Sequence, residues 1–265
     1  MPYLKQGNNF LYDSTTNDII GIKDADGGEM YFSSLTPYQP AAYGSTTSIG
    51  IVAPAATFTS LSASDDGSGN VLLSSAGVHG LTDTNALGRH VYVSWSGAGT
   101  DGLYEVLDAD SNTDELIIDY PYDAGLGTPQ TSNVTADITI VSQVIPANTA
   151  KVGMSYQLDL LFGMTGSTNN KTVKANYGSA AWYSQTVAAN IQSVCVEKKA
   201  CVKDSTTIIS NALAAPGHGT STGANVSMTP SGGIAAVQTL QIVGTIATAD
   251  EFIDLVAWKL KMNGA

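Results

Sequence analysis

The stretch His90-Val-Tyr-Val-Ser-Trp-Ser-Gly-Ala-Gly-Thr-Asp-Gly-Leu-Tyr-Glu-Val-Leu107 decides the fold class of this chain. Val91, Val93 and Trp95 share one parity, which is the period-two alternation of a half-buried β-strand. The turn-forming run Ser96–Asp101 then leads directly into a second apolar segment. Two short strands around a Gly-rich turn predict an antiparallel hairpin.

The same pattern extends in both directions from this hairpin. Turn signals fall about every 8–12 residues between short apolar runs, which is typical of all-β sandwiches and barrels. Only Leu81–Arg89 fits a single helical turn, and we find no amphipathic helical period elsewhere. We therefore predict an all-β chain. The predicted strands are 57–63, 70–74, 90–95, 102–108, 115–120, 136–144, 152–165, 171–176, 190–202, 205–214, 233–245 and 251–261.

The predicted strands and turns divide the chain into three regions. Residues 1–55 are predicted to form an N-terminal β-meander and an extended anchoring arm, because three apolar runs alternate there with Asp- and Gly-rich turns. The arm carries Tyr38 and Tyr43, which indicate that it lies against a surface. Residues 56–144 are predicted to form a small β-barrel, and residues 145–265 a jelly-roll-like β-sandwich.

The composition excludes several function classes. Charged residues make up 13% of the chain, with 11 basic and 23 acidic residues and a net charge of −12. A nucleic acid would be repelled by this charge. The longest apolar runs, such as Leu158–Phe162, are far shorter than the roughly 20 residues of a membrane-spanning helix. Met1–Asn9 lacks the apolar core of a signal peptide, so we expect synthesis in a cytoplasm.

The residues that usually carry catalysis are scattered. His79, His90 and His218 have no His or Cys neighbour at metal-ligand spacing. Cys195 and Cys201 are six residues apart, too far along one strand for a disulfide, so we expect two reduced thiols. We expect no enzymatic activity, no catalytic residues, no metal and no cofactor.

Closely spaced carboxylates occur in several turns. The run Asp108-Ala-Asp-Ser-Asn-Thr-Asp114 places oxygens at alternate positions but has no glycine at the sixth place. Asp and Asn commonly bond the backbone of their own turn, which is the favoured interpretation. A cation at Asp108–Asp114 and glycosidase-type acid/base chemistry remain alternatives.

Four aromatic residues lie on predicted strands: Trp95, Tyr104, Tyr120 and Tyr122. Filling of the core is the favoured interpretation, and a carbohydrate-binding face is the alternative. The tryptophans Trp95, Trp182 and Trp258 are spread over the chain and do not indicate one aromatic-lined cleft.

Three parts of the chain resemble pieces of tailed-bacteriophage virion structural proteins. Leu11–Gly28, with its Asp-Gly turn, is similar to the N-terminal segment of phage head and tail-fibre proteins. His90–Leu107 followed by Ile117–Asp123 resembles a small β-barrel inserted in such proteins. Ile145–Gly153 with Asn169–Lys174 looks like the entry strands of a β-sandwich in decoration and fibre proteins.

The resemblance implies a function as well as a fold. It implies a capsid decoration, cement or head-fibre protein that binds the shell through its N-terminal segment and belongs to the virion. The implied partners are the major capsid protein or other virion proteins and further copies of the chain, most simply as a homotrimer through the third region. A tail, baseplate or tail-fibre component and a carbohydrate-binding or carbohydrate-acting protein are the alternatives.

Overall fold

The computed structural model describes residues 5–7, 10–12, 19–23, 29–31, 41–109, 114–212 and 224–263. Two compact units divide the chain, Met1–Pro40 and Ala41–Ala265. His218 and the centre of the Asp108–Asp114 run lie outside the described residues.

The first unit is a four-stranded antiparallel sheet in sequence order. Phe10 pairs with Ile22, and Gly21 pairs with Tyr31, so each strand lies beside its predecessor in the chain. This confirms the predicted β-meander. The strands are β1 (Lys5–Gly7), β2 (Phe10–Tyr12), β3 (Ile19–Lys23) and β4 (Glu29–Tyr31).

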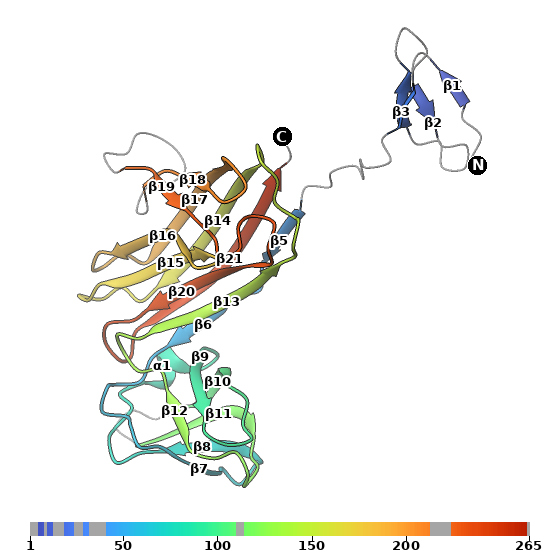
Figure 1. Cartoon of the computed structure of the whole chain (residues 1–265). Coiled ribbons are helices and arrows are strands. Elements are labelled where there is room, and N and C mark those ends of the chain that lie inside the picture. The colour runs from blue at the N-terminus through green and yellow to red at the C-terminus, as the bar shows by residue number, and fades with distance from the viewer. Residues whose placement is uncertain are drawn as a thin grey trace. The chain divides into compact units, whose positions relative to one another are not determined.

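The larger part of the second unit is a two-layer β-sandwich (Figure 1). The first layer runs in the order β19-β18-β17-β14-β21, with β5 and β6 pairing along the other side of β21. The second layer has the order β13-β20-β15-β16. The first-layer strands are β5 (Ala41–Ser45), β6 (Ile49–Val52), β14 (Ser155–Met164), β17 (Ser193–Val202), β18 (Ile208–Ser210), β19 (Val226–Met228) and β21 (Phe252–Asn263). The second-layer strands are β13 (Asp137–Ile145), β15 (Lys171–Tyr177), β16 (Ala180–Val187) and β20 (Gln238–Thr245).

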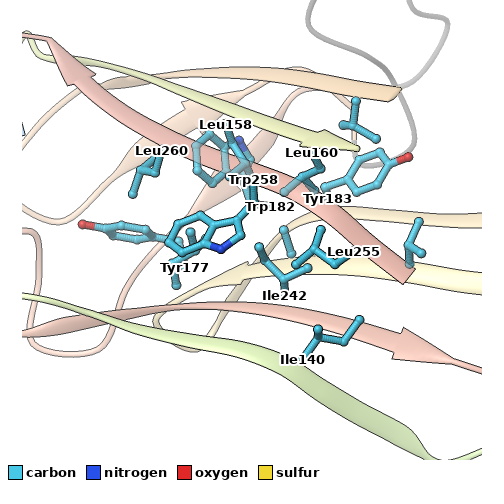
Figure 2. Packing of buried hydrophobic residues seen from close by; sticks show 14 of the residues in the cluster. Ile140, Leu158, Leu160, Tyr177, Trp182, Tyr183, Ile242, Leu255, Trp258 and Leu260 are labelled. Carbon is cyan, nitrogen blue, oxygen red and sulfur yellow. The ribbon is translucent and has the colours of Figure 1, made fainter. Parts of the chain in front are cut away.

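Large aromatic side chains fill the space between the two layers. Trp182, Tyr156 and Tyr177 are fully buried, and their rings contact one another at centroid distances of 5.5 to 6.5 Å. Figure 2 shows Trp182 and Tyr177 among leucine and isoleucine side chains that come from strands of both layers, including Leu260 and Ile242. Burial of this size is the main stabilising contribution to such a sandwich.

A smaller body, formed by the chain between β6 and β13 of the sandwich, has a hydrophobic core of its own. Its strands run in the order β12-β9-β10-β11-β8-β7, and its core contains Val71, Leu73, Val91, Val93 and Leu116. No helix among the described residues is long and apolar enough to cross a membrane. The elements are β7 (Ser62–Asp65), β8 (Asn70–Ser74), α1 (Asp83–Ala86), β9 (His90–Trp95), β10 (Gly102–Asp108), β11 (Glu115–Pro121) and β12 (Pro129–Thr131).

The strands of the smaller body do not close into the predicted β-barrel. The end strands β7 and β12 are four and three residues long, and they do not pair with each other in the described part of the chain. β12 begins at Pro129, which lacks a backbone donor, and β7 is polar. The second side of β9 is shared by β12 and β6, so the sheet continues into the sandwich: Ile51 pairs in parallel with His90.

Several segments differ from the sequence prediction. The strand expected at 57–63 begins only at Ser62, and β12 and β19 were not expected. Residues 41–45 and 49–52 were expected within an extended arm, but they form β5 and β6, which pair with β21. Tyr43 packs against the sandwich core, as expected for an arm residue that lies on a surface. β16 was not predicted, although Trp182 and Tyr183 within it are buried.

Candidate functional site

The start of β21 connects the two bodies because its side chains alternate between them. Asp254 and Phe252 point toward the smaller body, where Phe252 packs against its core. Ile253 and Leu255 are buried in the sandwich core. The pairing with β14 shifts at Val256, which forms a bulge between Leu255 and the following residues. Beyond this bulge the opposite parity faces the core.

Arg89 contacts both Asp254 and Phe252 in this joint between the two bodies. Its Nε lies 2.7 Å from Oδ1 of Asp254 and its Nη2 lies 2.8 Å from Oδ2, which is bidentate pairing. The guanidinium carbon lies 3.5 Å from the ring centroid of Phe252. Gly50 leaves room for this pair, since a Cβ there would lie 2.2 Å from Oδ1 of Asp254.

Asp250 forms a second contact between the bodies. Its Oδ1 accepts hydrogen bonds from the backbone N–H of Thr82 at 2.8 Å and from the Thr82 hydroxyl at 2.5 Å. Its carbonyl oxygen accepts a bond from the Asn85 side chain at 2.9 Å. Asp250 has a φ of 67°, a left-handed conformation that aspartate adopts more readily than most residues. These contacts fix α1 and its flanks against β21.

Glu251 points the other way, into the sandwich. Its Oε2 lies 3.5 Å from Nζ of Lys171, and both side chains are buried. The Asn169 amide donates to Oε1 at 3.1 Å, and Lys171 donates to the Ser167 hydroxyl at 2.9 Å. A buried pair of this kind fixes one arrangement of the loops and is costly to break.

A shallow groove of about 730 Å³ lies on the outer face of the first layer. Asp159 and Lys259 pair across it in register, and Glu197 pairs with Asp159 on the other side. Gly44 lets β5 approach β21, since a Cβ there would lie 2.6 Å from the Trp258 carbonyl oxygen. The remaining lining is small or apolar: Ala42, Tyr43, Ser45, Thr46, Thr47, Leu160, Leu161, Cys195 and Ala257.

The four aromatic residues singled out in the sequence pack against the core of the smaller body. Trp95 stacks on Tyr120 at a centroid distance of 5.5 Å, and Tyr104 meets Tyr120 edge-on at 4.6 Å. The Tyr120 hydroxyl accepts a bond from the Thr100 N–H at 3.0 Å, and the Tyr104 hydroxyl donates to the Thr100 carbonyl. Burial raises the pKa of Tyr104. The rings thus hold the 96–101 loop over the core, which supports core filling rather than a flat sugar-binding face.

The histidines and cysteines have separate environments. His79 is fully buried, its Nδ1 accepts a bond from the Leu81 N–H at 3.0 Å, and its ring meets Phe58 edge-on. His90 lies in β9, where Nδ1 is 3.2 Å from the Gly50 carbonyl oxygen. Cys195 and Cys201 are free and exposed on β17, which confirms the two unpaired thiols.

Carboxylates in the described turns bond their own backbone, as the favoured interpretation predicted. Oδ1 of Asp65 accepts from the Gly67 N–H at 2.8 Å, and Oδ1 of Asp66 accepts from the Ser68 N–H at 2.7 Å. The bond from Ser68 is the main cause that lowers the pKa of Asp66. Asp108 and Asp114 are exposed. Among the described residues, no group of three or more His, Cys, Asp or Glu side chains could hold a metal ion.

Sequence reasoning did not find the joint at Arg89, Asp250 and Asp254. The predicted strand 251–261 contained Asp254, but its alternation of buried and exposed side chains was taken as continuous. Asp254 lies in β21, but Asp250 precedes this strand and has a positive φ, so strand parity does not place the two side chains on one face. The sequence signal is therefore limited to an arginine just before one predicted strand and an aspartate within another.

Comparisons with known proteins found no matching family model and no matching curated protein. Among solved structures, the chain is similar to the CBM2 module of the evolved Dit of Lactobacillus casei BL23 phage J-1. The two share 10% sequence identity with a TM-score of 0.26, over 83% of this chain and 99% of that module. At this level the similarity carries no argument about function.

Proposed function

We propose that this chain is a bacteriophage virion structural protein of the capsid-decoration, cement or head-fibre type. Its N-terminal segment attaches it to the shell, where the major capsid protein is its partner, and its β-bodies are displayed. The observation that carries this proposal is the division between Pro40 and Ala41. A meander with strands of three to five residues buries little apolar area, whereas residues 41–265 contain two cores.

The proposed role needs no catalysis. His79 and Arg89, two side chains that could act as acid or base or bind anions, are used in contacts within the chain. The sequence resemblance to phage virion proteins supports the same assignment and implies no catalytic residue. Incubation of the purified protein with host polysaccharide is expected to release no sugar, and measurable turnover would contradict this part of the proposal.

The attachment is tested with particles that lack this protein. The full chain is expected to co-sediment with them, and a variant containing only residues 41–265 is expected to remain in the supernatant. Circular dichroism and a thermal melt of the shortened variant serve as its folding control. Equal binding of both chains would overturn the assignment of the anchor.

The number of copies in a virion separates head from tail. A decoration protein is expected in hundreds of copies, and a tail or baseplate component in a few to a few tens. Quantified gel lanes of purified heads and purified tails measure this directly. Recovery of the chain in the tail fraction alone would contradict the capsid assignment and favour the tail alternative.

A further inference from the structure

The edge strand β13 stands out among the strand edges of the second unit. It is nine residues long and pairs only with β20, so its other side has no strand partner in the described part of the chain. The edge strands β7, β12 and β19 have only three or four residues, and β5 has five. β16, at the far edge of the same layer as β13, lies against β19, and β13 likewise contacts β6 but pairs with no described strand on that side. A long open edge presents unpaired backbone donors and acceptors to any extended strand.

The sequence of β13 does not protect this edge. From Ile138 to Ile145 it contains no charged residue and no proline, which are the usual means of blocking an edge strand. Its pairing with β20 is irregular between Thr139 and Val141 and regular from Val141 to Ile145. Five consecutive residues thus keep the flat geometry that a further strand needs.

The edge is also electrically neutral, which matters for a chain with a net charge of −12. The single charge of β13, Asp137, lies 2.6 and 2.8 Å from Nζ of Lys174 and accepts a bond from the Thr245 hydroxyl at 2.5 Å. Burial acts to raise the pKa of Asp137, but these bonds outweigh it and lower the pKa overall. Because both copies carry net negative charge, their repulsion is weakest where neither presents unpaired charge.

Exposed apolar side chains accompany the regular part of the strand. Val144 is 54% exposed, and Val237, which precedes the residue paired with Ile145, is 59% exposed. These are among the most exposed large apolar side chains in the described residues. A neighbouring strand would cover Val144 through cross-strand contacts.

We propose that β13 pairs in antiparallel fashion with β13 of a second copy of this chain, joining two second layers into one continuous sheet. A two-fold axis near Gln143 places each Asp137 beyond the partner's Ile145, so that the two carboxylates do not face each other. The contact is isologous and closes after two copies. It therefore produces pairs of chains, whereas the sequence resemblance implied a trimer.

The test measures the mass of the full chain in solution by light scattering, at micromolar concentrations and without phage particles. Wild type is expected at twice the mass of one chain. Val144→Lys places a charge at the edge and is expected to weaken the pair about tenfold or more in Kd. Ser142→Lys, on the same strand, is the second variant in case Val144→Lys does not fold.

Val152→Lys is the matched control, because Val152 is 56% exposed and lies in the loop after β13. It is expected to leave the mass unchanged. A monomeric wild type, a trimer insensitive to Val144→Lys, or equal effects of Val144→Lys and Val152→Lys would each overturn the proposal. None of these outcomes bears on shell binding, which is measured with particles.

Discussion

The sandwich and the smaller body reach a closed core by different means. In the sandwich two sheets face each other, and bulky rings such as Trp182 and Tyr183 are fully buried between them. In the smaller body the described strands form one open sheet around mostly aliphatic side chains and the ring of Phe58, and half-buried rings such as Tyr120 cover the rim. An open sheet must therefore complete its core with loops and with residues at its rim. Such rim residues have a structural role even where, as exposed aromatic side chains, they resemble a binding site.

The largest expected effect comes from the centre of the sandwich. Trp182→Ala removes a fully buried ring and the bond from its Nε1 to the Ser210 hydroxyl, 3.1 Å long. We expect the free energy of unfolding to fall by about 4 kcal/mol. Trp95→Ala at the rim should cost about half as much, because that ring is partly exposed. Urea titrations of both variants measure the difference, and equal losses would contradict the distinction between the two cores.

Breaking the joint is expected to uncouple the two bodies. Arg89→Ala leaves the largely buried Asp254 carboxylate without its partner and should cost about 2–3 kcal/mol. Asp254→Asn and the double variant complete a mutant cycle, with an expected coupling of about 1–2 kcal/mol. Calorimetry should show two transitions in Arg89→Ala where wild type shows one. A single unchanged transition would show that the joint does not couple the bodies.

The buried histidine is expected to matter more than its loop position in the sequence indicates. His79→Ala removes a fully buried ring and leaves the Leu81 N–H without its acceptor, so we expect a loss of about 2 kcal/mol. His90→Ala, at a half-buried ring, should cost less than about 1 kcal/mol. Thermal melts of the two variants compare them, and a larger shift for His90→Ala would reverse the ranking.

A pH titration probes a buried cation in the sandwich. Lys198 is buried and donates to the carbonyl oxygens of Asn211 and Ala212, and burial lowers its pKa to about 8. Between pH 8 and 10.5 the unfolded chain holds a proton that the native chain has released, so stability should rise with pH, by at most about 1.4 kcal/mol per unit.

Lys198→Met should lack this rise while keeping a similar side-chain volume. Urea titrations from pH 7 to pH 10 compare the variant with wild type, and identical slopes would contradict the prediction. The range stops at pH 10 because burial raises the pKa of Tyr183 to about 12. The raised pKa means that Tyr183 contributes to the free energy of unfolding, and this contribution is lost as the pH rises from about 10 through 12.

The smallest effect is expected at the rim. Tyr120→Phe keeps the ring contacts with Trp95 and Tyr104 but removes the acceptor of the Thr100 N–H. We expect a loss of about 1 kcal/mol. Titration with soluble glycans should show no binding to either wild type or Tyr120→Phe. Glycan binding that this variant abolishes would restore the carbohydrate-binding alternative for the rim.

The all-β class and most strands could be predicted because alternation and turn residues act locally. Strands 70–74, 90–95 and 102–108 coincide with the predicted ranges. β6 and β12 could not be predicted, because short Gly- or Pro-containing segments become strands only through their partners β21 and β9. Closure of the smaller body was predicted wrongly for a related reason, since strand periodicity does not show which edges meet.

The joint between the two bodies could not be predicted from hydrophobic periodicity, for a different reason. The prediction for residues 252–262 found apolar residues on both faces and concluded that the strand is central. In the structure β21 does lie between β14 and β6. A bulge at Val256, however, changes which side chains face the core: odd-numbered residues before it and even-numbered residues after it. A bulge leaves no consistent mark in one sequence, so the facing of Glu251 and Asp254 could not be assigned.

That bulge also determines which genetic changes this region tolerates. Deleting the codon for Val256 would remove the extra residue and leave Ala257 and Leu255 on their partners Leu161 and Phe162, so Ile253 and Leu255 would stay in the core. Phe252 and Asp254 would keep facing the smaller body. A second deletion in this strand would find no bulge left to absorb it and would turn Ile253 and Leu255 outward. In related genes, the spacing from 250 to 258 should therefore be shorter by at most this one residue.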